Sequence, residues 1–117
     1  MKSGIFRLIM KESILRDKSY KFAIRIVKLS QYLQSEKKDF VLSKQILRSG
    51  TAIGALIREA EFGQSKADFA YKMSIALKEA SETAYWLLLL KDTKFINRLF
   101  SSEKVNVSAS ASVKKKR

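Results

Sequence analysis

Residues 39–63 read DFVLSKQILRSGTAIGALIREAEFG, and this stretch determines the expected fold class. Its apolar residues recur at intervals of three and four, which is the spacing of an amphipathic helix. At roughly 100° per residue, the apolar side chains fall within an arc of about 60°. They are Leu42, Ile46, Ile53, Ile57 and Ala60. Asp39 can cap the start of this helix, and Gly63 suits the left-handed position that follows the end of many helices.

Small residues interrupt the same segment. Gly50 and Gly54 lie in its middle, although glycine inside a helix costs about 1 kcal/mol relative to alanine. Two such costs predict that another backbone approaches the helix closely at this point. The sequence RSGT at residues 48–51 does not form a phosphate-binding loop, because it lacks the G-x-x-x-x-G-K-[ST] spacing and follows no predicted strand.

Further helices are expected on both sides of this segment. A cap at Asp17 opens a first helix that runs to about Gln34. Ser65, with Asp68 three residues later, forms a capping signal for a third helix that ends near Lys91. The chain has no proline and only four glycines, so it lacks the turn residues that a β-rich fold of this length needs.

Thr93 can cap a fourth, shorter helix that runs to Phe100. The predicted fold is therefore an all-α, antiparallel, up-and-down four-helix bundle whose fourth helix is short or degenerate. The bundle domain is expected over residues 14–100, after an N-terminal extension at 1–13. Residues 101–117 are rich in serine and end in four basic residues, which predicts a disordered basic tail.

The third helix carries more apolar surface than one bundle can cover. Residues 86–90 read WLLLL, and five consecutive helical residues face every direction. A helix that is apolar on all sides is buried on all sides, and one short fourth helix cannot cover this surface. A well-packed monomer is the alternative, but burial between protomers explains the surplus better. We therefore expect a homo-oligomer.

The composition disfavours catalysis. The 117 residues include no histidine and no cysteine, which removes the commonest general base and any thiolate metal site. Glu79 and Glu82 stand three residues apart, as do acids in some di-iron proteins, but no histidine completes such a site. Surface solvation and salt bridges explain these acids, and the pair Glu59 and Glu61, more simply. We expect no enzyme activity, no cofactor and no bound metal.

The charge balance predicts a polyanionic partner. Lys and Arg number 24 against 11 Asp and Glu, for a formal net charge of +13. Nucleic acid and an anionic membrane surface both fit such a charge. The longest apolar run, Ala84 to Leu90, is far shorter than the roughly 20 residues that span a bilayer. No export signal is present in the sequence, so a cytoplasmic location is expected.

The basic residues of the first two helices fall into narrow arcs. Each arc spans about 80°, and on the second helix it lies opposite the apolar side chains. On the first helix the arc lies between two apolar stripes. One stripe is Phe22, Ile26, Leu29 and Leu33, and the other is Tyr20, Ile24 and Val27. Cations along such arcs neutralise phosphates and release counterions. The predicted nucleic-acid-binding residues are Lys18, Lys21, Arg25 and Lys28 on the first helix and Lys44, Arg48 and Arg58 on the second.

Two other interpretations of these arcs stay open. A charged stripe opposite an apolar stripe is also the ordinary wet side of an amphipathic helix. In a ring of protomers, Arg48 or Arg58 can instead pair with Glu59 or Glu61 across a protomer boundary.

Several stretches between about residues 14 and 96 match a known pattern. They are DKSYKFA at 17–23, LSKQILRSGTAIGA at 42–55, IREA at 57–60, SKADF at 65–69 and ALKEA at 76–80, followed by Glu82, Thr83 and Trp86. Together they resemble the small four-helix-bundle proteins encoded in intervening sequences of bacterial 23S rRNA genes. The segment 42–55 is the most distinctive part of the resemblance.

The resemblance implies a four-helix protomer in a ring-like homopentamer. A similar fold occurs in the accessory protein of diversity-generating retroelements, which looks like a basic, nucleic-acid-binding barrel. Association with ribosomal RNA is implied by gene location and charge. We therefore expect a non-catalytic, self-assembling protein that binds RNA. The alternative is a structural, self-assembling protein whose partner is another protein.

Overall fold

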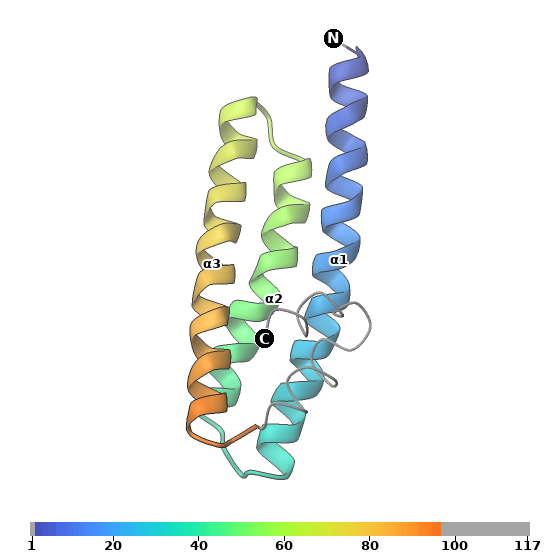
Figure 1. The fold of residues 1–117 in the computed structure, drawn as a ribbon. Coiled ribbons are helices and arrows are strands. Elements are labelled where there is room, and N and C mark those ends of the chain that lie inside the picture. Colours follow the sequence, from blue (N-terminus) through green and yellow to red (C-terminus); the bar gives the residue numbers. More distant parts are fainter. Residues whose placement is uncertain (1, 97–117) are drawn as a thin grey trace.

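The described part of the chain is all-helical. A computed structural model describes the backbone of residues 2–96 and the side chains of residues 14–96. It contains α1 (Lys2–Ser35), α2 (Leu42–Glu61) and α3 (Lys66–Asp92), and no strand among these residues. Successive helices run antiparallel, and α2 packs against both α1 and α3 and lies between them (Figure 1). The all-α class is confirmed.

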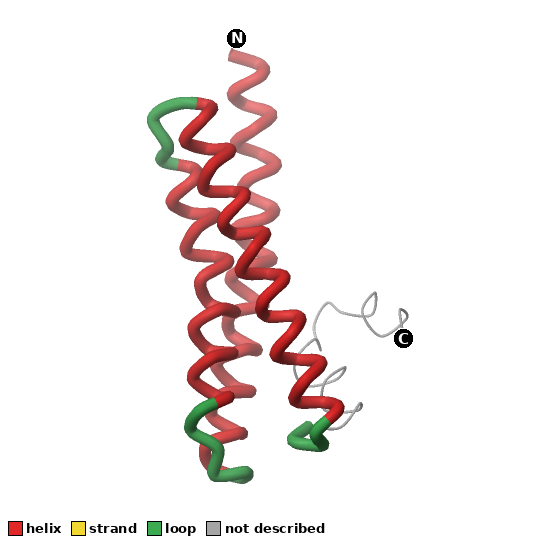
Figure 2. The backbone as a smooth tube through the Cα atoms, turned by 90° about the vertical axis from the view of Figure 1, so that its left-hand side faces the viewer, coloured by secondary structure: helices red, strands yellow, loops and turns green. Residues whose placement is uncertain are grey.

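The predicted fourth helix lies largely outside the described residues, at 97–100. Thr93, its expected cap, instead follows the last residue of α3. Lys94 adopts a left-handed backbone with φ of 68°, and the Phe95 N–H donates to the Leu90 carbonyl at 2.9 Å. These are features of a Schellman-type helix end. The chain therefore turns away from α3 at this point, as the short loop segment after α3 shows in Figure 2.

The first helix begins much earlier than the sequence analysis predicted. α1 starts at Lys2 and runs without a break through residues 2–13, so the prediction of a helix start at Asp17 is wrong. Asp17 lies inside the helix and pairs with Lys21 one turn later, at 3.3 Å. The physical reason is that no proline precedes Asp17, and a potential capping residue does not by itself interrupt a helix.

The starts of the other two helices follow the predicted capping residues. The Ser65 hydroxyl accepts from the Asp68 N–H at 3.0 Å, which confirms the cap of α3. α2 begins at Leu42, three residues after Asp39. The Asp39 carboxylate nevertheless accepts from the Ser43 N–H at 2.8 Å, so it satisfies an amide in the first turn. The predicted cap of α3 is therefore confirmed, whereas the N-cap residue of α2 is Val41 and Asp39 supports its first turn from two residues earlier.

The end of α2 differs from the prediction. No described glycine has a positive φ, so the left-handed conformation expected at Gly63 is wrong. The N–H groups of Phe62 and Gly63 donate to the carbonyls of Glu59 and Ala60, at 3.1 and 3.0 Å. These bonds tighten the last turn without a left-handed residue.

The core joins one face of each helix. Its buried cluster contains Ile26, Leu29 and Leu33 of α1, Ile46 of α2, and Leu90 and Ile96. On α2, Ile46, Ile57 and Ala60 of the predicted apolar arc are buried. The second apolar stripe of α1 remains outside this core, because Tyr20, Ile24 and Val27 are 55%, 41% and 37% exposed. One predicted apolar stripe of α1 therefore packs in the core, and the other is exposed at the surface.

A seam of small residues brings α1 and α2 together. A Cβ atom added to Gly50 would lie 2.8 Å from two side-chain carbons of Ile26. One turn later, a Cβ on Gly54 would lie 3.3 Å from the Ser19 hydroxyl oxygen and 3.5 Å from the Ser19 carbonyl oxygen. The close approach predicted from the two glycines is confirmed. It explains why α2 tolerates two residues that weaken an isolated helix.

Candidate nucleic-acid interface

The cations of α2 fall into two kinds of environment. Lys44 and Arg58 are exposed. The Arg58 guanidinium carbon lies 5.7 Å from the ring centroid of Tyr20 on α1, within the range of a cation–π contact. This contact places an exposed aromatic ring beside an exposed cation where the two helices meet. In the sequence Tyr20 belongs to an apolar stripe, a position that predicted no functional role for it.

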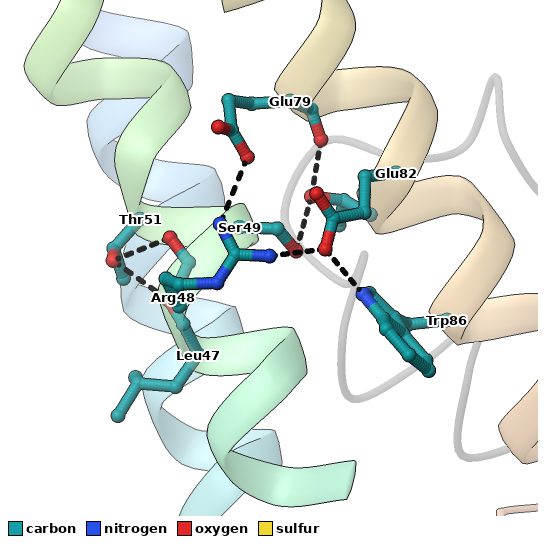
Figure 3. Close-up of polar contacts among 8 residues, drawn as sticks. Leu47, Arg48, Ser49, Thr51, Glu79, Glu82 and Trp86 are labelled. Atoms are coloured by element: carbon teal, nitrogen blue, oxygen red, sulfur yellow. Dashed lines mark hydrogen bonds and ion pairs between the residues drawn. The ribbon is translucent and has the colours of Figure 1, made fainter.

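Arg48 is engaged with acids of α3. Its guanidinium spans two carboxylates, with Nη1 3.4 Å from Oε1 of Glu79 and Nη2 in contact with Glu82. The Trp86 indole N–H donates to the same oxygen of Glu82 at 2.9 Å (Figure 3). We call Arg48, Glu79, Glu82 and Trp86 the Arg48 clasp. Its arginine is already neutralised within the chain, unlike Lys44 on the same helix, which is exposed and has no ion pair among the described residues.

A buried hydroxyl pair lies under the clasp. Thr83 Oγ1 lies 3.0 Å from Ser49 Oγ, and it donates to the carbonyl of Glu79 at 2.8 Å. Ser49 and Thr83 are both almost fully buried. Polar groups of α2 and α3 therefore meet in two layers, one buried and one exposed. This arrangement favours a structural role for Arg48 in holding the two helices together.

The acids expected to compete for the arginines of α2 have other partners in the chain. Glu59 binds Lys72 of α3 at 3.1 Å, and Glu61 binds Arg16 of α1 at 2.5 Å. The hydrogen bond and the charge of Glu59 raise the pKa of Lys72. Within the described residues, neither acid is paired with Arg48 or Arg58. Pairing of Arg48 or Arg58 with Glu59 or Glu61 across a protomer boundary stays a prediction.

The Arg48 clasp makes a testable contribution to stability. We expect Arg48→Met to lower the free energy of unfolding by about 1 kcal/mol, because Glu79 and Glu82 would be left side by side without a counter-charge. Urea denaturation followed by circular dichroism measures this change. Lys44→Met is the matched control, since Lys44 is exposed and makes no ion pair among the described residues, and it should change stability by less than about 0.5 kcal/mol. Equal stability of both variants would contradict a structural clasp.

The predicted cations of α1 also divide by exposure. Lys18, Lys21 and Lys28 are exposed, whereas Arg25 retains only 8% of its surface. Burial lowers the pKa of the Arg25 guanidinium, and its Nη2 atom has no hydrogen-bond partner. Arg25 therefore does not share the exposure expected for the arc. No sequence signal separated Arg25 from the three lysines, because all four share the arc between the two apolar stripes.

The described residues contain no obvious site for a metal ion. No three or more histidines, cysteines and acids gather into one group in this part of the chain. The described helices also include none that is long and apolar enough to cross a bilayer. The described surface offers exposed cations and several exposed aromatic and apolar side chains, of which Tyr20 lies beside the cation Arg58.

Comparison with known proteins places these features in a family. The family model described as 23S rRNA-intervening sequence protein matches residues 11–110. The fold is similar to the crystal structure of a protein of unknown function from the S23 ribosomal protein family of Bacteroides thetaiotaomicron VPI-5482, with a TM-score of 0.79. The two sequences are 54% identical, over 90% of this chain and 92% of the other. No curated protein matches the chain.

Proposed function

Because this chain belongs to the family of 23S rRNA-intervening sequence proteins, we propose that it is a non-catalytic, self-associating cytoplasmic protein that binds RNA through basic faces of α1 and α2. The family description ties its members to genes for ribosomal RNA, so ribosomal RNA is the first RNA to test. The single observation that carries the proposal is the set of exposed, unpaired lysines on these two helices.

These lysines differ from the other predicted cations. Lys18, Lys28 and Lys44 are exposed and have no ion pair among the described residues. Exposed lysines that no carboxylate neutralises retain their full attraction for phosphate, and each phosphate contact releases counterions. Arg58 adds a planar guanidinium stacked over Tyr20, which is suited to contacts with both phosphate and base.

Exposed apolar residues of α3 support self-association. Leu77 is 71% exposed, Tyr85 57% and Leu88 56%. Leu77 and Leu88 are eleven residues apart, close to three full helical turns, so they share a face of α3. Exposed leucines on one face of a helix gain free energy when another surface covers them. The family resemblance makes a homopentamer the expected assembly.

The RNA proposal predicts that RNA affinity depends strongly on salt and on the exposed lysines of α1 and α2. We expect fluorescence anisotropy with a labelled fragment of 23S rRNA to show binding whose affinity falls steeply with salt. The triple variant Lys18→Gln, Lys28→Gln and Lys44→Gln should weaken binding and flatten the log–log slope by roughly 0.7 to 0.9 for each phosphate that the protein no longer neutralises.

A matched control distinguishes RNA binding by one face of the protein from attraction by its net charge alone. The triple variant Lys66→Gln, Lys78→Gln and Lys91→Gln removes the same charge from exposed positions of α3. It should keep most of the affinity and the slope. An equal decrease in affinity in both variants would show that binding has no preferred face. Absence of RNA binding in a protein that still assembles would instead favour the alternative, a structural protein that binds another protein.

A further inference from the structure

We propose that Arg25 is the centre of an anion site on α1, and that the anion is a phosphate group. Its assignment to the phosphates of RNA rests on the proposed function, whereas binding of a phosphate group as such does not. The site would lie on the arc of α1 that carries Lys18, Lys21 and Lys28.

The unusual feature of Arg25 is that its charge is buried without a partner. The residue retains 8% of its surface, and its Nη2 atom is both buried and without a hydrogen-bond acceptor. Arg16, by contrast, contacts Glu61, and Arg48 contacts Glu79 and Glu82. Arg25 thus stands apart from the other buried or ion-paired arginines of the described chain.

A buried, unpartnered guanidinium is energetically unfavourable. Arginine does not lose its proton in proteins, so it cannot avoid the cost of burial by becoming neutral. A desolvated charge normally persists in a fold only when an opposite charge or a set of hydrogen-bond partners compensates it. No described carboxylate bonds to Arg25, so an anion from outside the described chain is the missing partner.

The surroundings on α1 favour a multiply charged anion over a single carboxylate. Lys21 lies four residues before Arg25 and Lys28 three residues after it, so both are neighbours on the helix surface. Lys18 lies seven residues before Arg25, two turns away on nearly the same line. Of these three lysines, only Lys21 forms an ion pair among the described residues, and its partner is Asp17.

Arg25 keeps only a small exposed surface, and an anion would reach the guanidinium from that side. Lys18 and Lys28 are exposed on either side of Arg25 along the helix, so their ammonium groups can hold an anion at the edge of the guanidinium. A guanidinium offers a planar fork of donors that matches two oxygens of a phosphate group. The lysines provide charge without a fixed direction, and Arg25 provides the directional contact.

The test uses the full chain and inorganic phosphate as the probe. Thermal unfolding is measured in sodium chloride and in sodium phosphate at equal ionic strength and pH. We expect phosphate at ten times its Kd to raise the Tm of the unaltered protein by roughly 5 °C or more. In Arg25→Met the phosphate-dependent shift should disappear, while the Tm in chloride should stay the same or rise, because an unpartnered buried charge has been removed.

Two further variants keep the test decisive. Arg25→Lys retains the charge but loses the fork, so it should fold and show a reduced phosphate shift. Lys66→Gln removes an exposed charge from α3 and should leave the shift unchanged. The absence of any phosphate shift in the unaltered protein would overturn the site. So would a full shift in Arg25→Met, or a large drop in its Tm in chloride.

Binding of the labelled 23S rRNA fragment separates the two sources of phosphate. If Arg25→Met loses both the phosphate shift and several-fold RNA affinity, the site takes a backbone phosphate of RNA. If it loses the shift but keeps RNA affinity, the site takes a small phosphate compound and the proposal for Arg25 holds. A phosphate shift in a protein that binds no RNA would overturn the proposed function and leave the anion site intact.

Discussion

Gly50→Leu is expected to lower the free energy of unfolding by about 3 kcal/mol, since overpacking a tight contact typically costs this much. Even a Cβ atom at this position would lie 2.8 Å from side-chain carbons of Ile26, which is fully buried. Isoleucine is branched at Cβ and cannot rotate away freely, so α1 and α2 must separate to admit a larger side chain. Urea unfolding followed by circular dichroism measures the decrease in stability.

The second glycine of the seam is the internal control. In Gly54→Ala the nearest atom, 3.3 Å away, is the Ser19 hydroxyl oxygen, at the end of a short side chain. The helix-propensity gain of up to about 1 kcal/mol should then offset the contact, leaving stability unchanged or slightly higher. If Gly50→Leu were as stable as Gly54→Ala, the tight packing of α1 against α2 would be contradicted.

The double variant Leu77→Glu and Leu88→Glu is expected to convert an assembly into single chains. Light scattering coupled to size exclusion should give the unaltered protein several times the 13.4 kDa chain mass, and about five times if it is a pentamer. Under the proposed self-association a neighbouring protomer covers both positions, so the two new carboxylates would have to be desolvated on assembly, which opposes association. Both leucines are largely exposed in the single chain, so the fold itself should survive.

A charge-matched variant controls for repulsion between protomers. Lys78→Gln with Lys91→Gln changes the net charge by the same two units at exposed positions of α3. It should assemble like the unaltered protein. An unaltered protein that is monomeric at micromolar concentration would contradict self-association, and an assembled double variant would place the interface elsewhere.

Much of the fold followed from local patterns in the sequence. The cap at Ser65 and the close contact at Gly50 both appear in the structure, because capping and helix propensity depend on a few neighbouring residues. The start of α1 and the conformation of Gly63 were predicted wrongly from the sequence. Among residues 2–96 the left-handed residues are Lys38 and Lys94, and lysine gives no sequence signal for that conformation.

The candidate site was less accessible to sequence analysis, because its chemistry depends on contacts between helices. A projection of α2 alone places Arg48 on a wet, basic face, but the acids that bind it lie on α3, more than thirty residues away in the chain. The same projection of α1 cannot separate Lys28 from Arg25, although one is exposed and the other buried. Exposure and pairing are properties of the packed molecule.

The chain has one tryptophan, and its place in the Arg48 clasp makes it an intrinsic optical probe. The Trp86 indole bonds to the carboxylate that also holds Arg48, and its ring meets Tyr85 edge-on with centroids 5.2 Å apart. Indole fluorescence responds to hydrogen bonding and polarity at the ring. The tryptophan emission therefore reports one junction, between α2 and α3, and separation of these helices can be followed without an attached dye.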